Sequence, residues 1–134
     1  MNFVNVVLQA RGEEVWAKED TKNGGGMAIK LLPQTSSQVM DHVGKKVIMG
    51  IRPEDIHATL SHSENGTEGT SIVATVDVVE PMGAEMYLYL STGCNTLVAR
   101  VEPQCTAKPR QTIQVAVNLE RVHIFDHKTQ KMIA

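Results

Sequence analysis

The stretch Arg52-Pro53-Glu54-Asp55 places an arginine and two adjacent carboxylates around a rigid turn, and these residue types could begin an active site. Acid–base catalysis requires groups that reach one reacting atom, and neighbouring residues on a turn rarely do so. A glycosidase pair would also need a sugar cleft, which the sequence does not mark. Pro53 ends a strand instead, because it lacks an N–H and keeps Arg52 extended. Glu54 and Asp55 then suit the positive end of a short helical turn, so we predict no catalytic residue here.

Other chemically active residue types lack the neighbours that their chemistry requires. The triplet 24–26 is not followed by the Lys and the Ser or Thr of a phosphate loop, so we predict a flexible connection without a nucleotide. The histidines show no zinc-ligand spacing, and no Gly-x-Ser-x-Gly nucleophile elbow is present. These histidines are His42, His57, His62, His123 and His127. We therefore predict no catalytic, cofactor-binding or metal-binding residue in this chain.

Composition limits the classes of protein to which the chain could belong. A chain of 134 residues, 42% of them hydrophobic, fits one domain with a buried core. Its formal net charge of -2 gives no basic surface for nucleic acid, and one Trp, two Tyr and two Phe are few for stacking on bases. No apolar run approaches the roughly 20 residues of a membrane-spanning helix, and no secretory signal is recognisable. Without export, Cys94 and Cys105 are expected to be free and reduced.

Apolar and polar residues alternate over most of the chain, which is the period of half-buried strands. Along the longest run, Ile72, Ala74, Val76 and Val78 are expected to share one face. Runs of this kind lie near residues 4–8, 14–18, 72–78, 86–90, 97–101, 113–117 and 122–125, with turn residues between them. Short strands at this spacing are typical of a barrel or a sandwich. We predict a mostly β fold, a small and nearly closed barrel like the oligonucleotide-binding (OB) fold, as a single domain over residues 1–134.

One segment, near residues 36–43, predicts a short helix. Ser36 or Ser37 can cap its start, and Gly44 can end it. Its apolar side would consist of Val39, Met40 and Val43.

Charged residues accompany two of the expected strands. If residues 86–90 and 97–101 form a hairpin, then Glu80, Glu85 and Arg100 flank it or lie within it. A cross-strand ion pair contributes about 0.2–1 kcal/mol, so its role would be to fix the register. We hypothesise that Glu85 and Arg100 are coupled across this hairpin.

Four segments stand in an order that identifies a family. They are GIRPEDI (50–56), VVEPMGAEMYLYL (78–90), LVARVEP (97–103) and VHIFDHKTQKMI (122–133). In sequence and order they resemble the C-terminal regulatory domain of the ATP-binding subunits of carbohydrate ABC importers, of the maltose, multiple-sugar and glycerol-phosphate type. The opening MNFV resembles the point at which that domain begins, so the resemblance spans the whole chain.

The resemblance implies a transport-associated OB-like barrel (TOBE or MOP type) excised from a longer protein. In that family an N-terminal nucleotide-binding domain binds ATP and Mg, and this chain has neither the phosphate loop nor the Leu-Ser-Gly-Gly-Gln signature. The chain alone is therefore expected not to hydrolyse ATP and to hold no cofactor. The implied partners are a second copy of the ATP-binding subunit, regulatory proteins and membrane permease subunits, at the cytoplasmic face of the cell membrane, with no nucleic acid among them.

Two turns provide candidates for a surface that binds a subunit or a regulator. These candidate residues are Arg52, Glu54, Asp55, Glu80 and Glu85. The alternative is that both turns are internal corners of the barrel, because turn chemistry explains them equally well.

A second interpretation of the chain is a small-oxyanion-binding barrel. Related transport-associated domains bind molybdate, generally between paired domains, through backbone N–H groups and Ser, Thr or Lys. The sequence leaves this alternative open.

Overall fold

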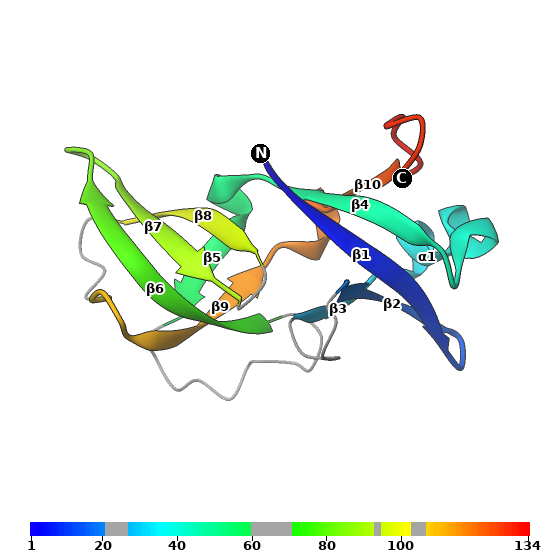
Figure 1. The fold of residues 1–134 in the computed structure, drawn as a ribbon, viewed down its shortest axis with the longest axis horizontal. Helices are drawn as coiled ribbons and strands as arrows, with labels where there is room; N and C mark the ends of the chain where they lie inside the picture. The colour runs from blue at the N-terminus through cyan, green and yellow to red at the C-terminus, as the bar shows by residue number, and fades with distance from the viewer. Residues whose placement is uncertain (21–26, 60–70, 93–94, 103–106) are drawn as a thin grey trace.

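The computed structural model describes residues 1–20, 27–59, 71–92, 95–102 and 107–134, and their fold is almost entirely β (Figure 1). The described strands form two antiparallel sheets of five strands each, which lie side by side along the long axis of the molecule. Buried residues of both sheets belong to one hydrophobic core. The predicted mostly β, OB-fold-like architecture is confirmed.

The first sheet has the strand order β10–β4–β1–β2–β3. Its strands are β1 (Asn2–Arg11), β2 (Glu14–Glu19), β3 (Ala28–Lys30), β4 (Lys46–Ile51) and β10 (His123–Asp126). The alternation predicted for β1 is confirmed, because Val4, Val6 and Leu8 are completely buried. Between β1 and β2 the chain turns at Gly12, whose φ of 65° suits a residue without a Cβ. β10, the last strand, pairs with β4 from the first half of the chain.

The second sheet has the strand order β5–β9–β6–β7–β8. Its strands are β5 (Ile56–Thr59), β6 (Ser71–Pro81), β7 (Met86–Ser91), β8 (Thr96–Val101) and β9 (Thr112–Val117). The two edge strands, β5 and β8, lie against each other, so the sheet curls into a nearly closed barrel. The predicted hairpin of β7 and β8 is confirmed, and it sets Tyr87 opposite Arg100.

The chain passes from the first sheet to the second at residues 52–55. After β4 ends, the 3-10 turn η2 (Pro53–Asp55) leads directly into β5. Pro53 begins this turn, and Arg52 before it is extended, with φ -76° and ψ 147°. The stretch therefore ends a strand, as predicted, and it is also the point at which the chain changes sheet. We call it the sheet crossing.

The helical segment forms, but its predicted start is wrong. The helix α1 covers Pro33–Gln38, and the 3-10 turn η1 (Met40–His42) follows it; a further 3-10 turn, η3, covers Leu119–Arg121. Proline begins α1 because its missing N–H would have no partner in the first turn of a helix, and no side chain caps the start. Ser36, predicted as a cap, is instead buried inside the helix. Met40, predicted on the apolar side, is exposed.

A β-bulge changes the expected pattern of β6. The pairing with β7 shifts register between Val76 and Val78, so one extra residue stands in β6. Ile72, Ala74 and Val76 are buried as predicted, whereas Val78 is half exposed. Strict alternation fails here because a bulge reverses the face to which the following side chains point.

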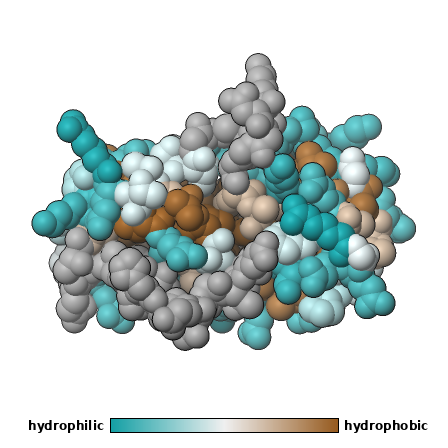
Figure 2. Space-filling model, turned by 90° about the horizontal axis from the view of Figure 1, so that it is seen from below, coloured by the Kyte–Doolittle hydropathy of each residue, from teal (hydrophilic) through white to brown (hydrophobic). Residues whose placement is uncertain are grey.

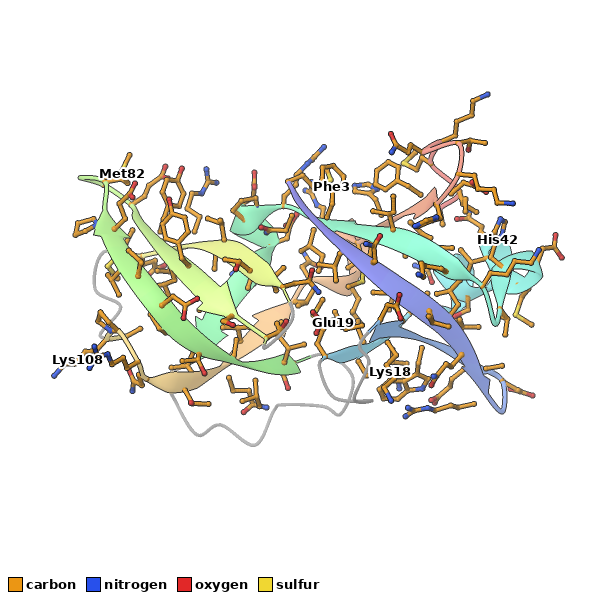
Figure 3. The ribbon with its side chains drawn as sticks, in the orientation of Figure 1. Phe3, Lys18, Glu19, His42, Met82 and Lys108 are labelled. Carbon is orange, nitrogen blue, oxygen red and sulfur yellow. The ribbon has the colours of Figure 1, made fainter. Side chains whose placement is uncertain are left out.

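Glu19 lies at the end of β2, between the two sheets (Figure 3). Its side chain is almost fully buried, and its carboxylate accepts hydrogen bonds from the Met27 N–H at 3.0 Å, the Thr92 hydroxyl at 2.7 Å and the Asn95 side-chain amide. Thr92 and Asn95 flank the turn that joins β7 to β8. A carboxylate is stable in a buried site only when such donors surround it. Glu19 thus fixes the β7–β8 turn against the first sheet.

We expect Glu19→Ala to lower the free energy of unfolding by about 3 kcal/mol or more, because it removes the acceptor of several donors that are buried or half-buried. Urea unfolding measures the change. Glu13→Ala, at an exposed position beside β2, is the matched control and should change the free energy of unfolding by less than about 0.5 kcal/mol. Equal effects of the two substitutions would show that Glu19 does not join the sheets.

Candidate functional site

Two carboxylates from separate parts of the chain lie close to the guanidinium of Arg100. Nε of Arg100 lies 3.6 Å from Oε2 of Glu85, and its Nη2 lies 4.0 Å from Oε2 of Glu54. The three side chains are 40–45% exposed, so the guanidinium and both carboxylates face solvent. We call these three residues the Arg100 cluster.

A different element positions each member of the Arg100 cluster. Arg100 is on β8, and η2, which carries Glu54, packs against that strand. Glu85 directly precedes β7 in a turn that is closed by a 2.8 Å hydrogen bond from the Met82 N–H to the Glu85 carbonyl. The cluster therefore joins the sheet crossing to the β7–β8 hairpin at the surface.

Four of the five residues predicted for an interaction surface are at least partly exposed: Arg52 and Glu54 are exposed, and Glu80 and Glu85 are half-buried. Glu54 and Glu85 are brought together by Arg100. Arg52 is exposed next to Glu54 in the chain, and its charge acts on that carboxylate. Glu80 is half-buried on β6, where it accepts a 3.4 Å hydrogen bond from the Tyr89 hydroxyl, so it stands apart from the cluster.

Asp55 does not belong to the exposed surface, contrary to the prediction. Only 7% of the residue is exposed. The turn directs it inward, because its N–H donates to the Arg52 carbonyl at 2.9 Å and its carbonyl accepts from the Asn118 N–H at 3.0 Å. Its Oδ2 is buried and has no hydrogen-bond partner among the described residues. The same turn thus provides an internal corner at Asp55 and a surface position at Glu54.

The pKa of Glu54 is lower than the ordinary value of a glutamate. The largest cause is a hydrogen bond from the residue's own backbone N–H, and the next is desolvation, which opposes it. The positive charges of Arg100, of Arg52 and of the N-terminus each add a smaller lowering effect. The ionised form is therefore favoured in the folded state. Its contribution to stability is complete above the usual glutamate range and is lost as the pH falls below it.

The sequence predicted the pair of Glu85 and Arg100 but missed the contact of Arg100 with Glu54. The first pair follows from the register of a hairpin whose strands are neighbours in the chain. The second depends on how η2 packs against β8, and no local periodicity reports a contact over that separation. Only the opposite charges of the two residues could have suggested it.

The described residues contain neither a metal-ligand cluster nor a membrane-spanning helix. In that part of the chain, no group of three or more His, Cys, Asp or Glu side chains could hold a metal ion. Nor does any helix of the described ranges have the length and apolar character to span a membrane. The triplet 24–26, His62, Cys94 and Cys105 lie outside the described residues.

The outer side of the first sheet carries an apolar contact. Phe3, which is exposed, meets Phe125 edge to face with ring centroids 5.9 Å apart. Gly50 allows this packing, because a Cβ there would lie 2.9 Å from Phe125 Cε2 and 2.7 Å from Met1 Sδ. Figure 2 shows another apolar stretch, over the half of the molecule that the second sheet forms. Apolar atoms make up over half of an average protein surface, so neither feature alone marks a binding site.

Two family models match the chain. The MalK OB fold domain matches residues 1–56, and the TOBE domain matches residues 49–125. The first match covers β1 to η2, and the second continues from β4 through the second sheet to β10. The two matches overlap at the sheet crossing.

Curated relatives of the chain are ATP-binding proteins of importers. The chain is 31% identical to the trehalose/maltose import ATP-binding protein MalK of Thermococcus litoralis over 99% of its own length and 34% of the relative. It is 32% identical to the oligosaccharides import ATP-binding protein MsmX of Bacillus subtilis over 81% of its length and 30% of the relative. It is also 33% identical to the sn-glycerol-3-phosphate import ATP-binding protein UgpC of Chromobacterium violaceum, over 67% of its length and 23% of the relative. The chain thus spans about a third or less of these relatives.

A solved structure shares the fold. The cytoplasmic molybdate-binding protein ModG with molybdate bound superimposes with a TM-score of 0.67, covering 92% of this chain and 94% of that one. At 12% sequence identity, the likeness concerns the fold alone.

We expect Glu85 and Arg100 to be coupled by about 0.2–1 kcal/mol, because their ion pair is half exposed and screened by solvent. A double-mutant cycle with Glu85→Gln and Arg100→Gln, read by urea unfolding, measures this coupling. The same cycle at about 1 M salt should give a smaller value. Additive losses at low salt would contradict the hypothesis that these charges are coupled.

We expect Arg100→Gln to raise the pKa of Glu54, because it removes one of the positive charges that favour the carboxylate. The pKa should stay below the ordinary glutamate value, since the backbone hydrogen bond remains. Titration of the Glu54 carboxyl group by NMR measures both effects. The control is Arg121→Gln, an exposed arginine on η3 outside the cluster, which should leave the pKa unchanged.

Proposed function

The chain belongs to the TOBE domain family, as its sequence predicted, and from this premise we propose that it is the regulatory and pairing domain of the ATP-binding subunit of a bacterial carbohydrate importer, with no catalysis of its own. The matched relatives are import ATP-binding proteins about three times as long as the matched segment, which supports a place in a longer chain. ATP and Mg would be bound by the nucleotide-binding domain of such a chain. The proposal places the domain at the cytoplasmic face of the membrane, where permease subunits, a second ATP-binding subunit and regulatory proteins are its partners.

The Arg100 cluster is the observation that carries this proposal. Its side chains come from the sheet crossing, the β6–β7 turn and β8, they face solvent, and one guanidinium lies near two carboxylates. An exposed pattern of both charge signs can select a complementary protein surface. Arg52 adds a second positive charge beside it. We therefore assign docking of a second subunit or of a regulator to the cluster.

A domain without catalysis can still regulate ATP hydrolysis, through pairing or through binding of a regulator. Two barrels that pair would hold their attached ATP-binding units at effective concentrations in the millimolar range, so that closure of those units becomes an intramolecular step. A regulator that binds only one arrangement would shift that closure by a coupling free energy of about 1–3 kcal/mol. Neither effect requires a residue of this domain to touch ATP.

The oxyanion-binding alternative has weaker support. The likeness to the molybdate-binding protein concerns the fold. At the Arg100 cluster, Glu54 and Glu85 stand on both sides of the guanidinium and would repel an anion. We therefore keep the pairing function as the proposal.

The proposal predicts that the 134-residue chain associates reversibly with itself at concentrations up to about 1 mM. Sedimentation equilibrium over a concentration series measures this association. Arg100→Gln should weaken it about fivefold or more, as expected for removal of an interface arginine. Arg121→Gln is the matched control and should leave it unchanged.

Three results would contradict the proposal. They are a chain that stays monomeric throughout the concentration series, equal losses from Arg100→Gln and Arg121→Gln, and ATP turnover by the purified chain. A melting temperature that rises steadily with molybdate concentration would instead favour the oxyanion-binding alternative.

A further inference from the structure

One asparagine pairs with the backbone of a strand in the other sheet. The side chain of Asn2, at the start of β1, donates from Nδ2 to the Val98 carbonyl at 2.9 Å and accepts the Val98 N–H at Oδ1 at 2.8 Å. Asn2 is only 8% exposed. Both backbone groups of Val98 are thus satisfied by one side chain from the first sheet.

The location of this contact explains why it exists. β8 is an edge strand, and alternate residues of an edge strand direct their N–H and C=O away from the sheet. The primary amide of Asn2 carries one donor side and one acceptor side in a plane, as a peptide group does. It therefore takes the place that a residue of a further strand would occupy. Aspartate, which offers only acceptors when ionised, and alanine, which offers nothing, lack this ability.

The contact is close to the Arg100 cluster. Val98 and Arg100 are two positions apart on β8, so their side chains lie on the same face of the strand. Just before β8 begins, Thr92 and Asn95 donate hydrogen bonds to Glu19 of the first sheet. After Val98, Arg100 meets Glu54 at the sheet crossing. Asn2 thus connects the first sheet directly to the strand that carries Arg100.

We propose that Asn2 is a positioning residue for the Arg100 cluster: by pairing with Val98 it sets the place of β8 against the sheet crossing and so aligns Arg100 with Glu54 for docking. The inference rests on the function proposed above for the cluster. In this arrangement β1, a strand of the first sheet, supports the Arg100 cluster, whose arginine lies on β8 of the second sheet (Figure 1). The docking surface therefore responds to the position of β1.

The first measurement concerns the contact itself. Asn2→Ala should accelerate hydrogen exchange of the Val98 amide about tenfold, since its acceptor is lost. Asn5→Ala, an exposed position on the same strand, is the matched control and should leave this exchange unchanged. Equal acceleration by both substitutions would overturn the inference, because it would mean that β8 loosens for a general reason.

The second measurement concerns positioning. Asn2→Ala should raise the pKa of Glu54 in the same direction as Arg100→Gln, because a displaced Arg100 no longer acts fully on that carboxylate. It should also weaken self-association, and the double variant with Arg100→Gln should be no weaker than Arg100→Gln alone. Asn2→Gln, which keeps both the donor and the acceptor, should recover part of each effect. If Asn2→Ala does not fold, Asn2→Leu, which keeps the size and loses both the donor and the acceptor, takes its place in each measurement.

The outcomes separate this inference from the proposed function. Faster exchange at Val98 with an unchanged pKa of Glu54 would overturn the positioning role of Asn2 and leave docking at the cluster intact. Self-association that ignores Arg100→Gln would overturn docking at the cluster. In that case the Glu54 titration still shows whether Asn2 positions Arg100, since it does not depend on association.

Discussion

A buried carboxylate between two sheets is the constraint on which the arrangement of this molecule depends. The carboxyl group of Glu19 can stay in the interior only while donors from the opposite sheet surround it, because a buried polar group without hydrogen-bond partners costs about 1–3 kcal/mol. The shared hydrophobic core holds the sheets together but fixes no particular geometry, since apolar attraction is not directional. The hydrogen bonds of Glu19 supply that direction. They determine which turn of the second sheet faces β2, and through β8 they determine where Arg100 emerges at the surface.

Local physics made much of the fold predictable from the sequence. Period-two alternation located most strands of the described chain and the hairpin of β7 and β8, but it marked no run for β3, β4 or β5, and only the end of β4 was expected, from Pro53. The errors have local causes that a pattern does not reveal. The predicted start of α1 was wrong because the helix begins at Pro33 and not at a capping serine. The predicted burial of Val78 was wrong because a bulge adds one residue to β6 before it. The contact of Glu54 with Arg100 and the contact of Asn2 with Val98 join distant parts of the chain, so only the packed molecule discloses them.

The sheet crossing shows how a motif that looks chemical can serve architecture and recognition together. Its proline ends a strand, one of its carboxylates turns inward and the other turns outward. The outward carboxylate, Glu54, lies near Arg100 on β8 of the hairpin. The motif thus ends a strand, carries the chain from one sheet to the other and presents a charged group at the surface.

The pairing of β10 with β4 has a consequence for how the molecule is made. The whole second sheet is synthesised between these two strands, so the edge of β4 lacks its neighbour for the several seconds that a ribosome needs to complete that sheet. During this interval the nascent first sheet exposes a free strand edge, a known starting point for aggregation. Rapid translation of the second half of the gene, or a chaperone at the exit tunnel, would reduce aggregation of the nascent chain through the free edge of β4.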